Sequence, residues 1–308
     1  MAQLPPLADT TLQYMPASDV PEADGLRAQI SSYDVQVNVP TQLGRNTFFI
    51  PGLQFHLDSV SYANEPPGFT PLNALFGIDM PMLLAHRVSE RWTLSARAWP
   101  GVAGDLEKLD ARALRVGALT MLNWSPGASF TTGGGGLVSY SFGELLPLPL
   151  VYVDWSPGPH FRLEASLPFF ASATLRLAHR AELGLSADVG GNEYAIGSRE
   201  IRERYPCVGS PDDPRTASDE RRAPLASCVD HVAYSVIAAG ADVRVRLLSS
   251  LWLSAFLGHT LYRRYDVQND DGSSVPGGNV DLPNVPLLRL GLTFRIPEPD
   301  AVEARALR

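Results

Sequence analysis

Lysine is almost absent from this sequence. Lys108 is its one lysine, arginine supplies the rest of the 25 basic residues, and 33 acidic residues outnumber them. The formal net charge is therefore −8. Proteins that bind nucleic acid usually carry a clustered excess of positive charge. The charge balance argues against a nucleic-acid partner.

The sequence also lacks a long apolar run. Its longest uncharged stretch, from Val116 to Gly143, is interrupted by Asn123, by Ser125-Pro126-Gly127 and by four consecutive glycines at 133–136. A membrane-spanning helix needs about 20 mostly apolar residues in a row. The start, "MAQLPP", has neither the basic nor the apolar region of a signal peptide. This start fits a cytoplasmic protein, or an exported chain whose signal peptide has been removed, which is the reading we expect.

Cysteine is nearly as scarce as lysine. Cys207 and Cys228 are the two cysteines, and they flank the polar stretch "VGSPDDPRTASDERRAPLAS". A disulfide between them would close a loop of about 22 residues and stabilise the fold by about 3 kcal/mol. We predict this disulfide, which implies an oxidising compartment; two free thiols are the alternative. The spacing fits no zinc pattern, so we expect no metal site.

Known catalytic motifs are missing. The sequence contains no GxSxG, HExxH or P-loop pattern. One pair, His56 and Asp58, lies on the same side of a predicted strand and could act with a serine in a lipid-modifying enzyme. Nothing else in the sequence supports that chemistry, so we predict no catalytic residue and no cofactor.

What the sequence does contain is alternation with a period of two. Apolar residues alternate with polar ones along almost the whole chain, as in the run "ADVRVRL" at 241–247. This period is typical of β-strands with one apolar face. The same alternation occurs at 33–39, 53–58, 114–123, 161–167, 182–189 and 288–295.

The connections between these strands alternate between short and long. Short ones follow residues 39, 87, 124, 155, 178 and 247, and longer or less regular ones, such as "GELLPLPL" at 143–150, lie between them. Outer-membrane barrels have short turns at one end and long loops at the other. The sequence therefore predicts one antiparallel transmembrane β-barrel domain over 1–308, with about fourteen strands, or twelve if one weak hairpin is not formed. The barrel itself should span about 10–295, and 296–308 form a C-terminal tail.

The tryptophans favour a membrane barrel over a soluble β-sandwich. Four of the five adjoin short turns at the same predicted end of the barrel, where a bilayer interface would attract the indole rings. We therefore predict a membrane-interface belt that consists of Trp92, Trp124, Trp155 and Trp252.

A membrane barrel directs its polar face inward. On that face we count eight basic and eight acidic residues, which can form ion pairs between strands and therefore predict no ion selectivity. The predicted lumen-lining residues are Arg97, Arg115, Arg162, Glu164, Arg176, Asp242, Arg244, Arg246 and Arg289.

Several stretches resemble a known family. "YSFGELLPLPLVYVDW" at 140–155, "FRLEASLP" at 161–168, "GGNEY" at 190–194 and "HTLYRRYDV" at 259–267 are similar to a bacterial family of outer-membrane β-barrels classified as a domain of unknown function. "PASD" at 16–19 and "VP" at 39–40 also fit. The resemblance implies a fold and a location in the outer membrane, but no activity. One departure is that Phe294 is followed by fourteen further residues, whereas many such barrels end on an aromatic residue.

The function expected from the sequence is a passive pore for small polar solutes, with outer-membrane lipid as its surroundings. Two alternatives of other classes stay open at this point. One is a structural or surface-binding barrel that acts through its outer loops, and the other is a soluble, secreted β-sandwich that binds a ligand.

Overall fold

The computed structural model describes residues 5–21, 23, 25–65, 71–105, 107, 111–141, 144–178, 180–204, 229–269 and 272–296. These residues form seventeen strands, one 3₁₀ turn and one short helix. The elements are β1 (Ala8–Asp19), β2 (Arg27–Asn38), β3 (Thr41–Gly44), β4 (Thr47–Ala63), β5 (Ala74–Asp79), β6 (Met82–Arg87), β7 (Trp92–Asp105), η1 (Ala111–Ala113), β8 (Leu114–Gly127), β9 (Phe130–Ser141), β10 (Glu144–Gly158), β11 (Phe161–Leu167), β12 (Phe170–Ala178), β13 (Ala181–Ala195), α1 (Arg199–Arg204), β14 (His231–Arg246), β15 (Leu251–Gln268), β16 (Ser274–Asp281) and β17 (Pro286–Phe294).

The strands form one sheet that closes on itself. Neighbours in the chain pair in antiparallel fashion, and β1 pairs with both β2 and β17, which completes the ring. Strands β5 and β6 act as one broken strand, because both pair with β4 on one side and β7 on the other. Strands β3 and β16 only extend the hairpins of β4 and β15, so the wall is a closed antiparallel barrel of fourteen strands. The predicted fourteen-stranded transmembrane barrel is confirmed, and neither twelve strands nor a two-sheet sandwich is found.

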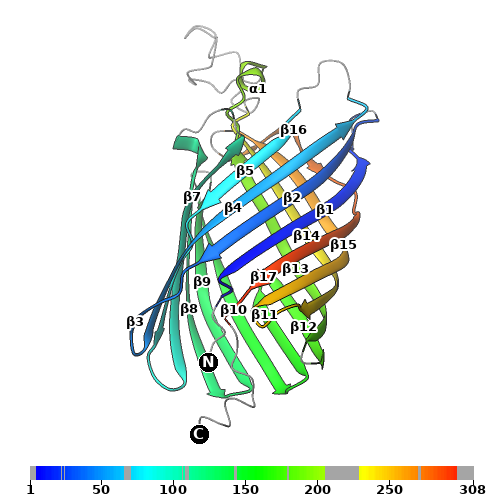
Figure 1. Cartoon of the computed structure of the whole chain (residues 1–308). Coiled ribbons are helices and arrows are strands. Elements are labelled where there is room, and N and C mark those ends of the chain that lie inside the picture. Colours follow the sequence, from blue (N-terminus) through cyan, green and yellow to red (C-terminus); the bar gives the residue numbers. More distant parts are fainter. Residues whose placement is uncertain are drawn as a thin grey trace.

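The two ends of the barrel differ. Strand β1 starts and β17 ends at the lower end in Figure 1, where tight turns such as that between β8 and β9 connect the strands. We name this end the turn end and the opposite one, with helix α1, the loop end (Figure 1). Among the described residues, no helix is long and apolar enough to cross a membrane.

Alternation determines which side chains face outward. Leu183, Leu185 and Val189 on β13 are exposed, whereas Gly184 and Asp242, which is its partner on β14, are buried inside the ring. Leu288, Leu290 and Leu292 on β17 are exposed in the same way. A continuous exposed aliphatic surface of this kind is costly in water and suits the hydrocarbon core of a membrane.

One segment differs from the sequence-based expectation. The run "GELLPLPL" was expected to be an irregular connection, but Glu144–Leu150 continues β10 and pairs with β9 up to Glu144 and Ser141. Its two prolines do not prevent this pairing, since only alternate residues of a strand donate hydrogen bonds to a given neighbour.

At the loop end apolar side chains pack across the interior. Strand β13 bends inward, so that Tyr194 and Ile196 pack with Leu75 and Ala103 on the opposite wall, and Ala195 pairs with Gly104 of β7. The bend occurs at Gly191, where φ is +156° and a Cβ atom would lie 2.4 Å from the carbonyl oxygen of Tyr234. Glycine is therefore required at this position.

The neighbouring strand contributes a second packed cluster. Tyr234, Val236 and Ala238 of β14 pack with Met15 and Ile30 of β1 and β2. The gap that remains beside Asp58, Tyr234 and Tyr265 leaves no room for a water molecule. The interior is therefore narrowed at the loop end by two apolar clusters.

Candidate functional site: the barrel interior

The interior toward the turn end carries charged side chains in pairs. Arg162 on β11 contacts Asp154 on β10 with N–O distances of 3.0 and 3.1 Å, and it also lies 3.0 Å from Glu164. Tyr152 donates a hydrogen bond of 3.3 Å to Glu164. All four residues have their side chains on the inward side, and one arginine here serves two carboxylates.

A second arginine is held deeper in the interior. Arg115 on β8 donates two hydrogen bonds to Asp79 on β5, one of them 2.8 Å long, although β7 lies between these strands. Arg97 on the intervening β7 lies with its guanidinium carbon 5.6 Å from the centre of the Trp99 ring. The inward side chains of this wall therefore contact one another over more than one strand.

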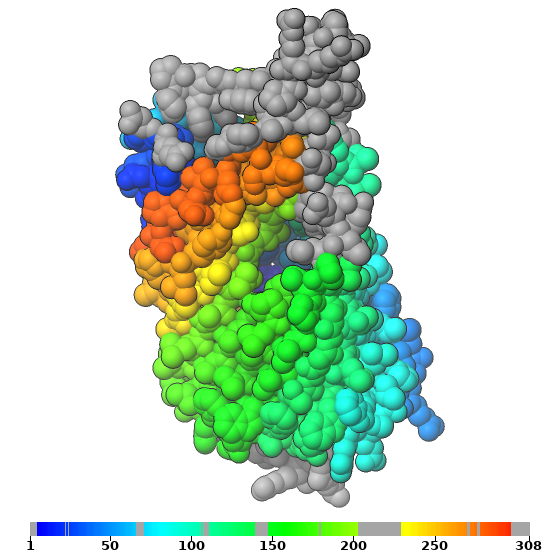
Figure 2. Space-filling view, turned by 180° about the vertical axis from the view of Figure 1, so that it is seen from behind, coloured from blue at the N-terminus to red at the C-terminus, as the bar shows by residue number. Residues whose placement is uncertain are grey.

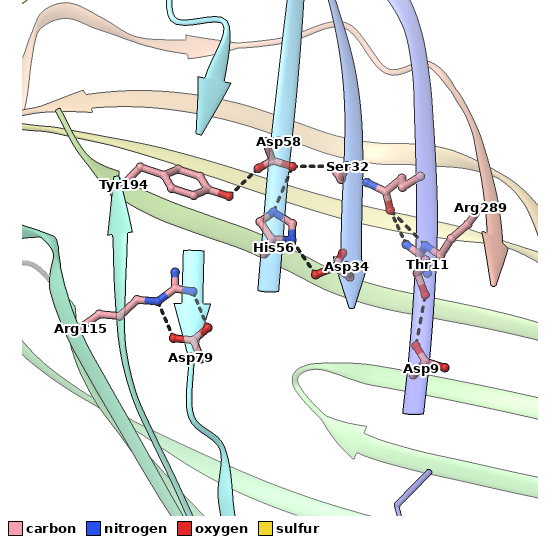
Figure 3. Close-up of polar contacts among 11 residues, drawn as sticks. Asp9, Thr11, Ser32, Asp34, His56, Asp58, Asp79, Arg115, Tyr194 and Arg289 are labelled. Atoms are coloured by element: carbon pink, nitrogen blue, oxygen red, sulfur yellow. Dashed lines mark hydrogen bonds and ion pairs between the residues drawn. The ribbon is translucent and has the colours of Figure 1, made fainter. Parts of the chain in front are cut away.

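Arg289 forms hydrogen bonds with residues of two other strands. From β17 it contacts Asp188 on β13 at 3.2 and 3.1 Å, and it donates to Gln13 on β1 at 3.1 and 2.9 Å. Its guanidinium carbon also lies 5.0 Å from the centre of the Phe256 ring. Figure 3 shows Arg289 extending toward the strand that carries Thr11, which is β1.

The remaining predicted lumen residues lie near the turn end. Arg244 is 3.3 Å from Asp242, and Arg176 is 3.4 Å from Glu182. Arg246 lies over the ring of Trp252. The nine residues that the sequence assigned to the lumen are thus all on the inward side of the wall.

Trp252 does not share the side of the other turn-end tryptophans. It stands opposite Arg246 and Thr293 in the sheet, and the guanidinium carbons of Arg246 and Arg295 lie 5.8 and 5.9 Å from its ring. Because Thr293 is buried inside the ring of strands, Trp252 faces the interior. The prediction that Trp252 belongs to the outward-facing belt is therefore corrected. Nearness to a turn did not determine which side of the sheet it faces.

The other three tryptophans face outward. Trp92 and Trp124 are direct partners in the sheet, and their rings are 6.4 Å apart. Trp155 contacts Phe161 edge to face at 5.9 Å. All three are about 40% exposed (41%, 37% and 42%) on the outer face, where an interfacial belt would lie.

His56 lies at the centre of a buried polar group. Its Nδ1 is 2.6 Å from Asp34, and its Nε2 is 3.1 Å from Asp58 (Figure 3). Ser32 donates a hydrogen bond to Asp58, and Tyr194 donates another of 2.7 Å. Both ring nitrogens face a carboxylate, so the geometry suits the doubly protonated imidazolium form.

This arrangement determines what His56 can do chemically. A nucleophilic serine needs a neutral histidine nitrogen that accepts its proton. Here Ser32 donates to Asp58, and both nitrogens of His56 are directed at carboxylates. The group is built as a structural ion-pair cluster that joins β2, β4 and the bent end of β13. In the described residues no cluster of His, Cys, Asp and Glu has the arrangement of a metal site.

A second polar cluster lies at the loop end, outside the spanning strands. Asp230 accepts a hydrogen bond of 2.6 Å from Arg112 and lies 3.0 Å from His231. Burial alone would raise the pKa of Asp230, but the hydrogen bonds from His231 and Arg112 hold it below its usual range. Cys207 and Cys228 lie outside the described residues, so their disulfide stays a prediction that thiol counting without reductant will test.

The sequence-based count of inward charges missed an apolar part of the interior. Leu119 and Met121 on β8, Leu137 on β9, and Leu148 and Leu150 on β10 have the same inward parity as the charged residues. They adjoin one another across the sheet, since Leu119 pairs with Leu137 and Leu137 with Leu148. We name these five residues the apolar wall. The alternation of β8 shows which of its residues face inward. Because both its inward and its outward residues are mostly apolar around Leu119 and Met121, polarity did not distinguish the two sides there.

Known proteins resemble this chain mainly in fold. A search of curated proteins finds no similar sequence. An outer membrane channel of Pseudomonas putida F1 is 12% identical, with 95% of this chain and 97% of that chain covered and a TM-score of 0.44. The TodX monoaromatic hydrocarbon channel of Pseudomonas putida, as a deltaS2 mutant, is 9% identical with coverages of 94% and 89% and a TM-score of 0.45.

A third solved structure, LpxR from Salmonella typhimurium, is 9% identical, with coverages of 94% and 99% and a TM-score of 0.37. These similarities are low and concern the barrel fold. A family model, described as "Domain of unknown function (DUF6268)", matches residues 1–210, which is more than half of the chain. This inward-charged, outward-apolar barrel therefore belongs to the DUF6268 family.

Proposed function

We propose that this protein is a passive channel in the bacterial outer membrane through which small polar solutes diffuse. The outward aliphatic residues support the membrane location. The observation that supports the channel is the charged, partly exposed interior near the turn end. There the side chains of Arg244 and Arg176 are 35% and 52% exposed, although they lie inside a closed ring of strands. Exposure of inward arginines at this end is what a water-accessible lumen would give.

The pairing of charges limits what such a channel selects. Arg162, Arg244 and Arg289 each contact at least one carboxylate, so the lumen carries alternating charges in place of a field of one sign. A field of one sign is what steers ions by charge. The two apolar clusters at the loop end narrow the path, so the expected conductance is small and the expected solutes are small.

Planar-bilayer recording tests this proposal. The wild-type protein is expected to give stable unitary conductance with weak ion selectivity. Arg244→Glu and Arg246→Glu should shift selectivity toward cations, because each adds negative charge to the wetted part of the lumen. Arg91→Glu is the matched control, since Arg91 is exposed in the turn between β6 and β7. If correctly folded protein gives no unitary conductance in the bilayer, the channel proposal is contradicted. The function would then be assigned to the outer loops.

A further inference from the structure

One part of the barrel wall is much shorter than the rest. Strands β11 and β12 have seven and nine residues, whereas the adjoining β10 and β13 have fifteen each. The pairing of β10 with β11 ends at Val151 and Leu167. The pairing of β12 with β13 ends at Phe170 and Asp188, apart from one hydrogen bond from Val189 to Phe169. Beyond this hairpin, β10 and β13 continue toward the loop end.

These two continuing segments do not close the wall between them. Residues 144–150 of β10 pair with β9, and residues 189–195 of β13 pair with β14, but within the described residues no pairing joins β10 to β13. The inward bend at Gly191 takes β13 away from β10 and toward β7. Figure 2 shows a hollow in the wall between these parts, through which blue atoms of the N-terminal strands on the far wall are visible.

The sequence of β10 is adapted to a free edge. Alternate residues of a strand direct their N–H groups to opposite neighbours. Pro147 and Pro149 have no N–H, so the ladder with β9 uses the residues between them, and the prolines direct their nitrogens toward the gap. In a membrane barrel an unpaired N–H is costly, and proline on the free side of an edge strand removes it. Two prolines at this edge indicate a lasting opening.

The inner surface on the β10 side of the gap is apolar. The apolar wall lies on β8, β9 and β10, and Leu148 and Leu150 belong to the part of β10 that pairs with β9 but has no partner strand on its other side. Gly135 adds no side chain to this surface, and a Cβ atom there would lie only 2.0 Å from the carbonyl oxygen of Thr120. Toward the turn end the next inward residue of β10 is Tyr152, whose hydroxyl contacts Glu164. Apolar and polar surfaces therefore follow each other along β10.

We propose that the gap between β10 and β13 is a lateral passage that connects the lumen with the lipid phase for single-chain amphipathic molecules. The alkyl chain would lie along the apolar wall, and the polar head would face Tyr152 and the Arg162 ion pairs. The surfaces beside the gap determine this choice of occupant. The gap opens on the lipid side, and the inner surface that it leads to is apolar near the gap and charged toward the turn end, so it suits a molecule with one alkyl chain and one polar head. The proposal rests on the proposed channel function and gives that channel a second outlet besides the narrowed loop end.

Spin-label accessibility tests whether lipid reaches the lumen. In a Cys207→Ser/Cys228→Ser background, one label is placed at Ser166, an inward residue at the end of β11, and a control label at Ser254, an inward residue of β15. Oxygen concentrates in the hydrocarbon phase, whereas a nickel chelate stays in water. The Ser166 label is expected to be at least threefold more accessible to oxygen than the Ser254 label in lipid vesicles. Equal, low oxygen accessibility at both sites overturns the lateral passage.

Photolabelling tests the occupant. A diazirine-bearing decanoate in the vesicle membrane is expected to label peptides that contain Met121 or Leu150, and excess decanoate should reduce this labelling. Labelling confined to exposed residues such as Leu185 overturns the proposed occupant. A diazirine on a phospholipid chain that labels the same peptides without competition would assign the site to bilayer lipid and also overturn it. Both readouts are independent of conductance, so failure of the channel and failure of the lateral passage are distinguishable.

Discussion

Replacing the two prolines at the free edge of β10 tests the open wall by the sign of a stability change. Pro147→Val/Pro149→Val adds two N–H groups that point into the gap. Each unsatisfied N–H away from water costs about 1–3 kcal/mol. Valine favours a strand by at most about 1 kcal/mol per residue. Two such groups cost about 2–6 kcal/mol, and the two valines offset up to about 2 kcal/mol. From the midpoint of the first range, the expected net effect is a loss of about 2 kcal/mol in the free energy of unfolding, and of at most about 4 kcal/mol if the full offset applies.

The measurement is reversible urea unfolding in lipid vesicles, followed by tryptophan fluorescence and by heat-modifiable migration on a gel. Pro126→Val/Pro157→Val is the matched control, because both prolines are exposed at the turn end and their new N–H groups would meet water. We expect the control to change stability by less than about 0.5 kcal/mol. If the double variant in β10 is as stable as the wild type or more stable, then its N–H groups find partners, and the reasoning about a free edge is wrong.

Three further predictions concern other parts of the barrel. Asp79→Ala leaves the Arg115 guanidinium without its buried partner and should cost about 3–5 kcal/mol in urea unfolding, part of which Asp79→Ala/Arg115→Leu should restore. In single-tryptophan variants, brominated lipid chains should quench Trp155 strongly and Trp252 weakly, and equal quenching would contradict the inward position of Trp252. The pKa of Asp230 is lowered in the folded state, so its carboxylate stabilises the fold above the unfolded pKa, and this stabilisation is lost as the pH falls through the folded pKa. Below about pH 4 the wild type should therefore lose stability relative to Asp230→Asn. Parallel pH profiles of the two proteins would refute this.

The strands and the side that each residue faces could be predicted from the sequence because alternation is a local property. The run from Ala241 to Leu247 shows it: Asp242, Arg244 and Arg246 face inward, as their period of two predicts. Trp252 was misassigned because it comes directly after a turn, where no established alternation precedes it. Its side becomes clear only from the register with Thr293 on β17, a long-range fact.

The opening in the wall could not be predicted either, because it depends on which distant strands pair. A short hairpin around Pro168 and a glycine pair at 190–191 are both visible in the sequence, but neither says which strands they separate. The contact of Tyr194 with Asp58 joins residues 136 positions apart, so it depends on the whole ring being closed. The prolines of β10 were visible in the sequence as well, but they predicted a loop, because prolines are rare within strands.

The short hairpin also gives the molecule a front and a back in the plane of the membrane. At about 3.3 Å per residue, the seven residues of β11 extend about 23 Å, and the eighteen residues of β15 about 59 Å. With a tilt of about 40°, the low side rises about 18 Å, less than the roughly 25 Å apolar band of such barrels. Lipids next to β11 and β12 therefore meet a different protein height from lipids elsewhere around the ring. Membrane thickness thus becomes a variable that acts on one side of this protein, and neighbouring barrels that approach from that side encounter a locally altered bilayer.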